Sequence, residues 1–174
     1  MILREKDLAD EQLLPLARSI SSIAAGHGRR LIVNSSLEVA GAVKAWGVQL
    51  PFGIFDEARR DGRLEKNNFG VSVHSLEQAV IAEEAGARWV LAGNIFATDC
   101  KKGLPGRGPE FLRKLKHRLS IPVWAVGGLS AGNIELAARA GADAVCLMSG
   151  LLQAENVESE VERCLESFRR ARLP

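Results

Sequence analysis

Short apolar runs alternate with longer amphipathic runs along the whole chain, and this alternation constrains the fold more than any other feature. Such a pattern is typical of repeated strand–helix units, because a parallel strand needs a crossover helix before the next strand can begin. Several of the short runs are almost entirely apolar, as strands covered on both faces should be. The seven predicted strands are Met1–Arg4, Leu31–Asn34, Gly47–Leu50, Phe69–Val73, Trp89–Gly93, Pro122–Gly127 and Ala144–Met148.

The amphipathic segments carry recognisable helix ends. Ser75 is a good N-cap for a helix that closes at Gly86, and Gly141 closes a second helix. The sequence A-G-A-x-x-V marks both of these helix-to-strand turns. The clearest predicted helices are Asp10–Ala25, Leu76–Ala85, Gly108–Leu119, Asn133–Ala140 and Val157–Arg172.

The unbroken order of these units favours an α/β fold of the TIM type, a (β/α) barrel of parallel strands, in one domain over residues 1–174. An open doubly wound sheet is the alternative, but no G-x-G-x-x-G follows the first strand. Seven strands leave the barrel one strand short, and we expect its first βα unit to be absent here. The two edge strands would then be a template for pairing with a second copy, whereas a longer cellular product would close the gap.

Composition excludes several classes of protein. The 174 residues include 23 basic and 21 acidic side chains, and a formal net charge of +2 does not indicate a nucleic-acid surface. The three cysteines have no C-x-x-C spacing, which argues against a disulfide framework or a structural zinc site. No apolar run is long enough for a membrane span or a signal peptide. The sequence therefore predicts a soluble cytoplasmic protein without a nucleic-acid or membrane partner.

A long polar loop follows one of the apolar strands, and Trp89–Gly108 reads W-V-L-A-G-N-I-F-A-T-D-C-K-K-G-L-P-G-R-G. Barrel enzymes carry their active-site loops at the carboxyl ends of strands, and this one is rich in glycine and cations. We expect Thr98 and Lys101 to contact an anionic ligand. Cys100 would titrate if the neighbouring cation lowers its pKa, and an inert small side chain is the alternative. For the whole segment the alternative is a solvated surface loop.

Two glycine-bearing segments, V-G-G-L at Val126–Leu129 and L-M-S-G at Leu147–Gly150, end consecutive strands and open helices. Glycine lets backbone N–H groups approach an oxyanion, and a serine adds a hydroxyl donor. Both ends fall in the last two βα units, where TIM barrels often bind phosphate. We predict a phosphate cradle here, with ordinary structural turns as the alternative. Its residues are Gly127, Gly128, Met148, Ser149 and Gly150.

Together with L-R-E-K-D-L at Leu3–Leu8, L-I-V-N at Leu31–Asn34, G-V-Q-L-P at Gly47–Pro51 and G-V-S-V-H-S-L-E at Gly70–Glu77, these segments resemble the thiamine phosphate synthase superfamily. The resemblance spans nearly the whole chain. Within that superfamily, T-D-C-K-K-G-L-P-G-R-G at Thr98–Gly108 is similar to the TenI-type thiazole tautomerase branch.

The resemblance implies distinct residues for the synthase reaction. Arg4 and Lys6 match the residues that grip a pyrimidine diphosphate in the synthases. The carboxylates that would hold magnesium are replaced, because Ser35 and Ile54 occupy their places and Asp56 would substitute only after a register shift. We therefore expect no cofactor, with magnesium needed only if the chain is a synthase. Synthase activity is the alternative function.

In the tautomerases a histidine shuttles a proton on a thiazole carboxylate phosphate, and Asn94 stands at its place. An amide does not titrate near neutral pH, so Cys100 and His74 are the replacement candidates, although His74 also suits a helix-capping region. The predicted function is a tautomerase-like isomerase or phosphorylated-thiazole-binding protein in thiamine biosynthesis, and a non-catalytic regulatory barrel remains open. The ligand-binding residues outside the cradle are Arg4, Lys6, Asn34, Gln49, Ser72, Thr98 and Lys101.

Overall fold

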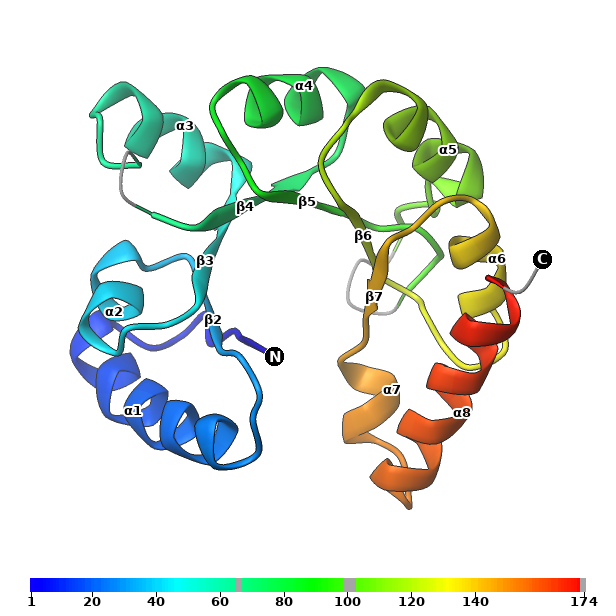
Figure 1. The fold of residues 1–174 in the computed structure, drawn as a ribbon, viewed down its shortest axis with the longest axis horizontal. Helices are drawn as coiled ribbons and strands as arrows, with labels where there is room; N and C mark the ends of the chain where they lie inside the picture. The colour runs from blue at the N-terminus through cyan, green and yellow to red at the C-terminus, as the bar shows by residue number, and fades with distance from the viewer. Residues whose placement is uncertain (65–66, 99–102, 173–174) are drawn as a thin grey trace. The chain divides into compact units, whose positions relative to one another are not determined.

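The structure is a computed structural model that describes residues 1–64, 67–98 and 103–172. These residues form seven strands that alternate with helices and follow one another in the sheet in chain order (Figure 1). The predicted TIM-type α/β class and the seven strands are confirmed. The strands are β1 Ile2–Leu3, β2 Ile32–Asn34, β3 Gly47–Pro51, β4 Phe69–Val73, β5 Trp89–Ala92, β6 Val123–Val126 and β7 Ala144–Cys146.

The five predicted helices are present, and three short helices that we did not predict join them. Ser75 Oγ accepts from the Gln78 N–H at 3.1 Å, as expected of a cap, and Gly86 and Gly141 have φ of +88° and +96°. The helices are α1 Asp10–Gly26, α2 Leu37–Ala42, α3 Phe52–Arg60, α4 Leu76–Glu84, α5 Gly108–Arg118, α6 Ile134–Arg139, α7 Ser149–Leu152 and α8 Val157–Arg170.

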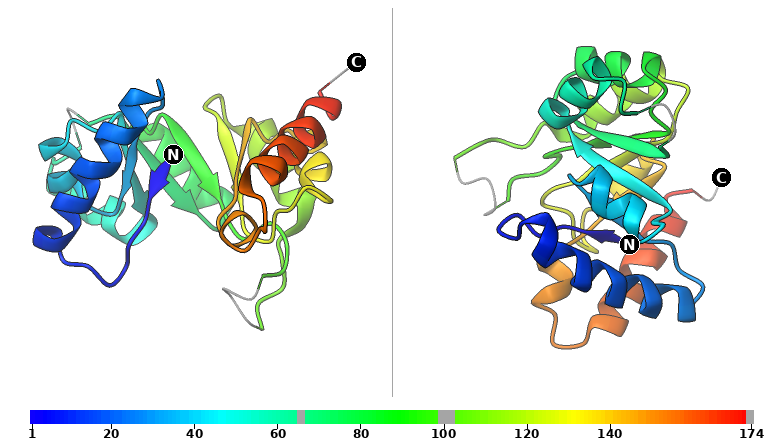
Figure 2. Two further views of the ribbon diagram at one scale, coloured as in Figure 1. Left: turned by 90° about the horizontal axis from the view of Figure 1, so that it is seen from below. Right: turned by 90° about the vertical axis from the view of Figure 1, so that its left-hand side faces the viewer.

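The chain divides into two compact units. The first unit comprises Met1–Ser72 and Ala85–Arg88, and the second comprises Val73–Glu84 and Trp89–Pro174. In the first unit β1, β2, β3 and β4 are parallel neighbours, so that the strand ends lie along one edge. Helix α1 contacts α2 beside this sheet (Figure 2).

The core of the first unit is formed by the apolar strands and by α3. Val33, Val48 and Leu50 are fully or almost fully buried, and the Phe55 ring stacks on Phe69 with centroids 6.1 Å apart. Trp46, which precedes β3, is less buried than these residues: 36% of it is exposed, and the Arg30 guanidinium lies 5.1 Å from its ring centroid. The apolar pattern of these strands therefore reflects burial on both faces, as predicted.

In the second unit β5, β6 and β7 are parallel neighbours, and α8 packs against α6. Trp89 of β5 stacks on Trp124 of β6 with ring centroids 4.8 Å apart. The Glu83 carboxylate on α4 accepts hydrogen bonds from the backbone N–H groups of Ser120 and Ile121. Burial alone would raise the pKa of Glu83, but these bonds and the Ser120 hydroxyl hold it below the ordinary value. The carboxylate thus ties α4 to the segment that enters β6.

Among the described helices, none combines the length and the apolar character that crossing a membrane requires.

Candidate functional site

Neutral polar side chains gather at the strand ends of the first unit. Gln49 lies in β3 with none of its surface exposed, and its Nε2 donates to Ser72 Oγ at 3.0 Å. Asn34 is the register partner of Gln49, and its Nδ2 donates to Ser35 Oγ at 2.5 Å. The structure therefore brings Asn34, Gln49 and Ser72 together, and their predicted role in ligand binding stays a prediction. We call these three residues with Ser35 the strand-end cluster.

Two cations follow β1 in the same unit. Arg4 and Lys6 come directly after the strand, and both are exposed. No ion pair joins either side chain to a carboxylate in the part of the chain that the structure describes. Both positive charges therefore remain available to an anion.

In the first unit, the described residues 1–64, 67–72 and 85–88 do not offer a group of ligands for a magnesium site. The strand-end cluster has only amide and hydroxyl oxygens, whereas magnesium is usually bound through carboxylate and phosphate oxygens. Ile54 lies in the first turn of α3, and the Asp56 carboxylate accepts from Arg59 Nη2 at 2.8 Å and from Arg60 Nη2 at 3.0 Å. The hydrogen bond from Arg59 lowers the pKa of Asp56, and the nearby Arg60 charge acts in the same direction against desolvation. No group of three or more His, Cys, Asp or Glu side chains in residues 1–64, 67–98 and 103–172 is arranged to hold a metal.

Magnesium should therefore leave ligand affinity unchanged. We expect the same dissociation constant for thiazole phosphate in magnesium chloride as in EDTA at matched ionic strength, because no described carboxylate cluster responds to the ion. Isothermal titration calorimetry measures both constants, and titration with magnesium alone is the control. An increase in affinity of about tenfold or more with magnesium would contradict the conclusion that the described residues do not fit a magnesium site.

One backbone carbonyl organises the polar residues at the end of β4 and β5. The Gly93 oxygen accepts from Arg107 Nε at 3.2 Å and lies 2.8 Å from His74 Nδ1. Because a carbonyl only accepts, Nδ1 of His74 must carry the proton in this contact. The ring of His74 is thus held at the strand end by a structural bond. Whether it also handles a proton of a substrate stays a prediction.

Asn94 fastens the base of the loop that follows β5. It is 5% exposed, its side-chain Nδ2 donates to the Pro105 oxygen at 3.4 Å, and its backbone carbonyl oxygen accepts from the Arg107 N–H at 2.9 Å. A Cβ on Gly106 would lie 2.6 Å from the Ile95 oxygen, so the returning segment of the loop passes very close to the residues that follow β5. The amide at position 94 therefore has a structural use, and Arg107 and Gly106 are site residues that we did not predict. The sequence G-R-G at residues 106–108 is the feature that could have identified them.

The structure describes one of the three residues that were predicted to act in this loop. Thr98 is half-buried, and Cys100 and Lys101 lie outside the described residues. The proposed roles of all three stay predictions.

The glycine pair after β6 fits against the same loop. Gly127 and Gly128 have φ of +97° and +64°, and a Cβ on Gly128 would lie 2.3 Å from the Ala97 oxygen. The Phe96 N–H donates to the Gly127 oxygen at 3.0 Å. Glycine is needed here because the chain of the β5 loop fills the space of any side chain. This packing role is one that we did not predict from the sequence.

The predicted cradle residues lie at neighbouring strand ends. A Cβ on Gly150 would be 3.8 Å from the Leu129 oxygen, so the turn after β7 lies beside the turn after β6. Ser149 opens α7 and is half-buried, and Met148 before it is 49% exposed. Burial raises the pKa of Cys146 in β7 to about 11, so its thiol stays protonated near neutral pH.

Comparison with known proteins agrees over most of the chain. The family described as thiamine monophosphate synthase matches residues 1–151. The thiamine-phosphate synthase of Methanosarcina barkeri is 35% identical over 173 residues, which is 97% of this chain and 77% of that protein. The synthase of Geobacillus kaustophilus is 33% identical over 159 residues, 90% of this chain and 72% of that protein. A solved thiamine phosphate pyrophosphorylase from Pyrococcus furiosus superposes with a TM-score of 0.85 at 27% identity, over 99% of this chain and 83% of its own.

These relatives correct the predicted function. Curated proteins 30% to 35% identical to this chain are named thiamine-phosphate synthase, and the prediction of a thiazole tautomerase is therefore wrong. The synthase alternative agrees with the relatives better. The T-D-C-K-K-G-L-P-G-R-G loop that suggested the tautomerase branch includes the glycine and arginine that close the loop base. Because the family matches residues 1–151 and a synthase relative is 35% identical over 97% of the chain, this chain belongs to the thiamine monophosphate synthase family.

Proposed function

We propose that this chain is a thiamine-phosphate synthase, an enzyme that joins a thiazole phosphate to a pyrimidine diphosphate. The observation that carries the proposal is the 35% identity to a synthase over 97% of the chain. In the reaction the thiazole nitrogen supplies an electron pair for a new bond to the methylene carbon of the pyrimidine. The carbon–oxygen bond to diphosphate breaks, and the diphosphate leaves with that electron pair.

This chemistry needs no proton carrier, which suits the residues present. A ring nitrogen with a lone pair attacks without losing a proton, so no general base is required at the reacting atoms. The buried amide of Asn94 and the protonated thiol of Cys146 are compatible with such a step. A reaction that moves a proton between carbons would instead require a titratable group near neutral pH.

Residues of both units suit parts of this reaction, and each set lies within its own unit. In the second unit the turn at Gly127 and Gly128, with the Ser149 hydroxyl, takes the thiazole phosphate. In the first unit Arg4 and Lys6 neutralise the departing diphosphate, since both are exposed cations without an ion-pair partner among the described residues. The strand-end cluster supplies neutral hydrogen bonds to the pyrimidine ring.

The test is direct synthesis with the purified chain. We expect thiamine phosphate and diphosphate to form in equal amounts from the two substrates, measured by mass spectrometry and by release of diphosphate. A variant with Arg4→Gln and Lys6→Gln should lose most turnover while retaining the affinity for thiazole phosphate, because only the leaving group loses its cations. Absence of product from a folded chain that binds both substrates would refute the proposal.

A further inference from the structure

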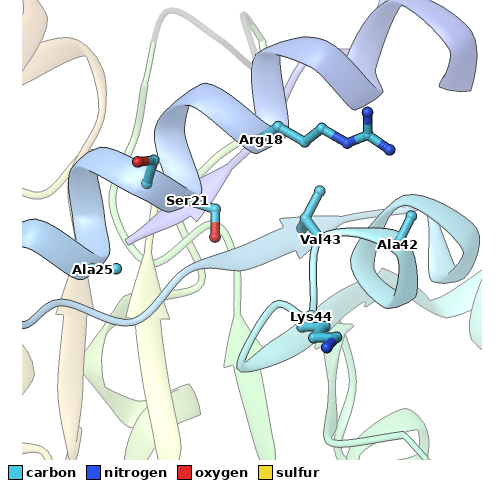
Figure 3. Close-up of a pocket in the computed structure, with 7 residues that line it drawn as sticks. Arg18, Ser21, Ala25, Ala42, Val43 and Lys44 are labelled. Carbon is cyan, nitrogen blue, oxygen red and sulfur yellow. The ribbon is translucent and has the colours of Figure 1, made fainter.

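A groove of about 330 Å³ lies on the outside of the first unit, between α1 and the turn that leaves α2 (Figure 3). Arg18, Ser21 and Ala25 lie along α1 on one side, and Val43 and Lys44 lie across from them. None of the lining residues belongs to the strand-end cluster or to the cations after β1. The full lining is Arg18, Ser21, Ser22, Ala25, Ala42, Val43 and Lys44.

The polar lining of this groove is cationic and hydroxylic. Arg18 and Lys44 are exposed, and neither forms an ion pair with a carboxylate in residues 1–64 or 67–98. No acidic side chain is among the lining residues. By contrast, Arg59, Arg60 and Arg63 of the same unit all pair with Asp or Glu. The groove therefore combines two unneutralised positive charges with two serine hydroxyls.

Lys44 occupies a backbone conformation that lysine rarely adopts. Its φ is +49°, and it closes α2 with its N–H on the Gly41 oxygen at 3.1 Å, while the Ala45 N–H bonds the Ala40 oxygen at 2.9 Å. Glycine is the usual residue at such a helix end, and glycine stands at the ends of α4 and α6. A left-handed lysine costs stability, and strain of this kind is often retained where a side chain has a function.

We propose that this groove binds a small phosphate-bearing anion. Lysine and arginine donate charge-assisted hydrogen bonds to phosphate oxygens, and the serine hydroxyls supply further donors. The volume is large enough for more than one phosphate group, so inorganic diphosphate is a suitable probe. The inference does not rest on the proposed synthase activity, because no residue of the groove has a part in that reaction.

The experiment follows backbone amides by NMR while inorganic diphosphate is added, with potassium chloride at matched ionic strength as the reference. We expect saturable shifts at Ser21, Ser22 and Lys44. Arg18→Gln should weaken this binding about tenfold, since it removes one charged hydrogen-bond donor. Arg88→Gln is the matched control, because Arg88 is an exposed cation of the same unit outside the groove, and the shifts should persist unchanged.

Lys44→Gly separates binding from folding. Glycine relieves the left-handed strain, so we expect a higher melting temperature without ligand together with about tenfold weaker diphosphate binding at the groove. Arg18 lies on the exposed surface of α1, so Arg18→Gln should leave the fold intact. This variant still tests the proposal if the glycine variant folds poorly. Shifts that do not saturate, or shifts that both variants leave at full strength, would overturn the proposal. Binding at Arg4 and Lys6 alone would also overturn it, whatever the synthase assay shows.

Discussion

Gly128→Ala should destabilise the protein by about 2–4 kcal/mol, from the combined cost of a left-handed non-glycine residue and an overpacked contact. The φ at this position is +64°, and the new Cβ would lie 2.3 Å from the Ala97 oxygen and 2.8 Å from the Phe96 carbonyl carbon. Both contacts are backbone atoms, which cannot move aside as a flexible side chain would. Equilibrium unfolding in urea measures the loss.

Gly132→Ala is the matched control for this substitution. It lies in the same connection between β6 and α6, its φ is not in the left-handed region, and within 4 Å its Cβ would meet only Ser130 Oγ, at 3.8 Å. We expect its unfolding free energy to change by about 0.5 kcal/mol or less, as for a surface substitution. Equal effects of the two alanines would show that the turn does not pack tightly against the β5 loop.

Ser149→Asp should weaken binding of thiazole phosphate by roughly 100-fold, or about 3 kcal/mol, because a carboxylate placed against a phosphate repels it. Ser149 is half-buried at the start of α7, so water screens this repulsion only in part. Calorimetric titration gives the two affinities.

Ser149→Ala serves as the neutral comparison. It removes one hydroxyl donor without adding charge, and we expect a loss of about tenfold or less. Circular dichroism checks that both variants remain folded. If the aspartate variant keeps the wild-type affinity, the phosphate does not bind beside Ser149 and the cradle assignment fails.

The strands were predictable because burial on both faces leaves a strong local signal. Val48 and Leu50 stand in an apolar run with 1% and 0% exposure, and such a run needs no knowledge of its partners. The short helices were harder, since α3 begins directly after Pro51 without a side-chain cap and α7 has only four residues. For α2 the sequence did offer a signal, because Ser36 is a typical N-cap residue and its Oγ accepts from the Val39 N–H.

The candidate site was predictable only where it depends on residues that lie close together in the sequence. That Ser35 and Ile54 carry no carboxylate is visible in the sequence, and the pairing of Asp56 with Arg59 and Arg60 follows from i,i+3 and i,i+4 spacing. The packing of Gly128 against Ala97 joins residues far apart in the chain, so a glycine pair alone could not reveal it. The wrong prediction of a tautomerase rested on a short loop motif, and two residues of that motif, Gly106 and Arg107, have a structural use in closing the loop.

The tryptophans give the two units separate optical signatures. The chain has no tyrosine and three tryptophans, so its near-ultraviolet emission comes from those three rings. Trp46 of the first unit is 36% exposed, whereas Trp89 of the second is 1% exposed and stacks on Trp124 at 4.8 Å. Stacked indoles at this separation couple their electronic transitions, whereas the partly exposed indole of Trp46 lies beside the Arg30 guanidinium, 5.1 Å from its ring centroid. Near-ultraviolet dichroism therefore follows the second unit, and a Trp46→Phe difference spectrum follows the first, without any added label.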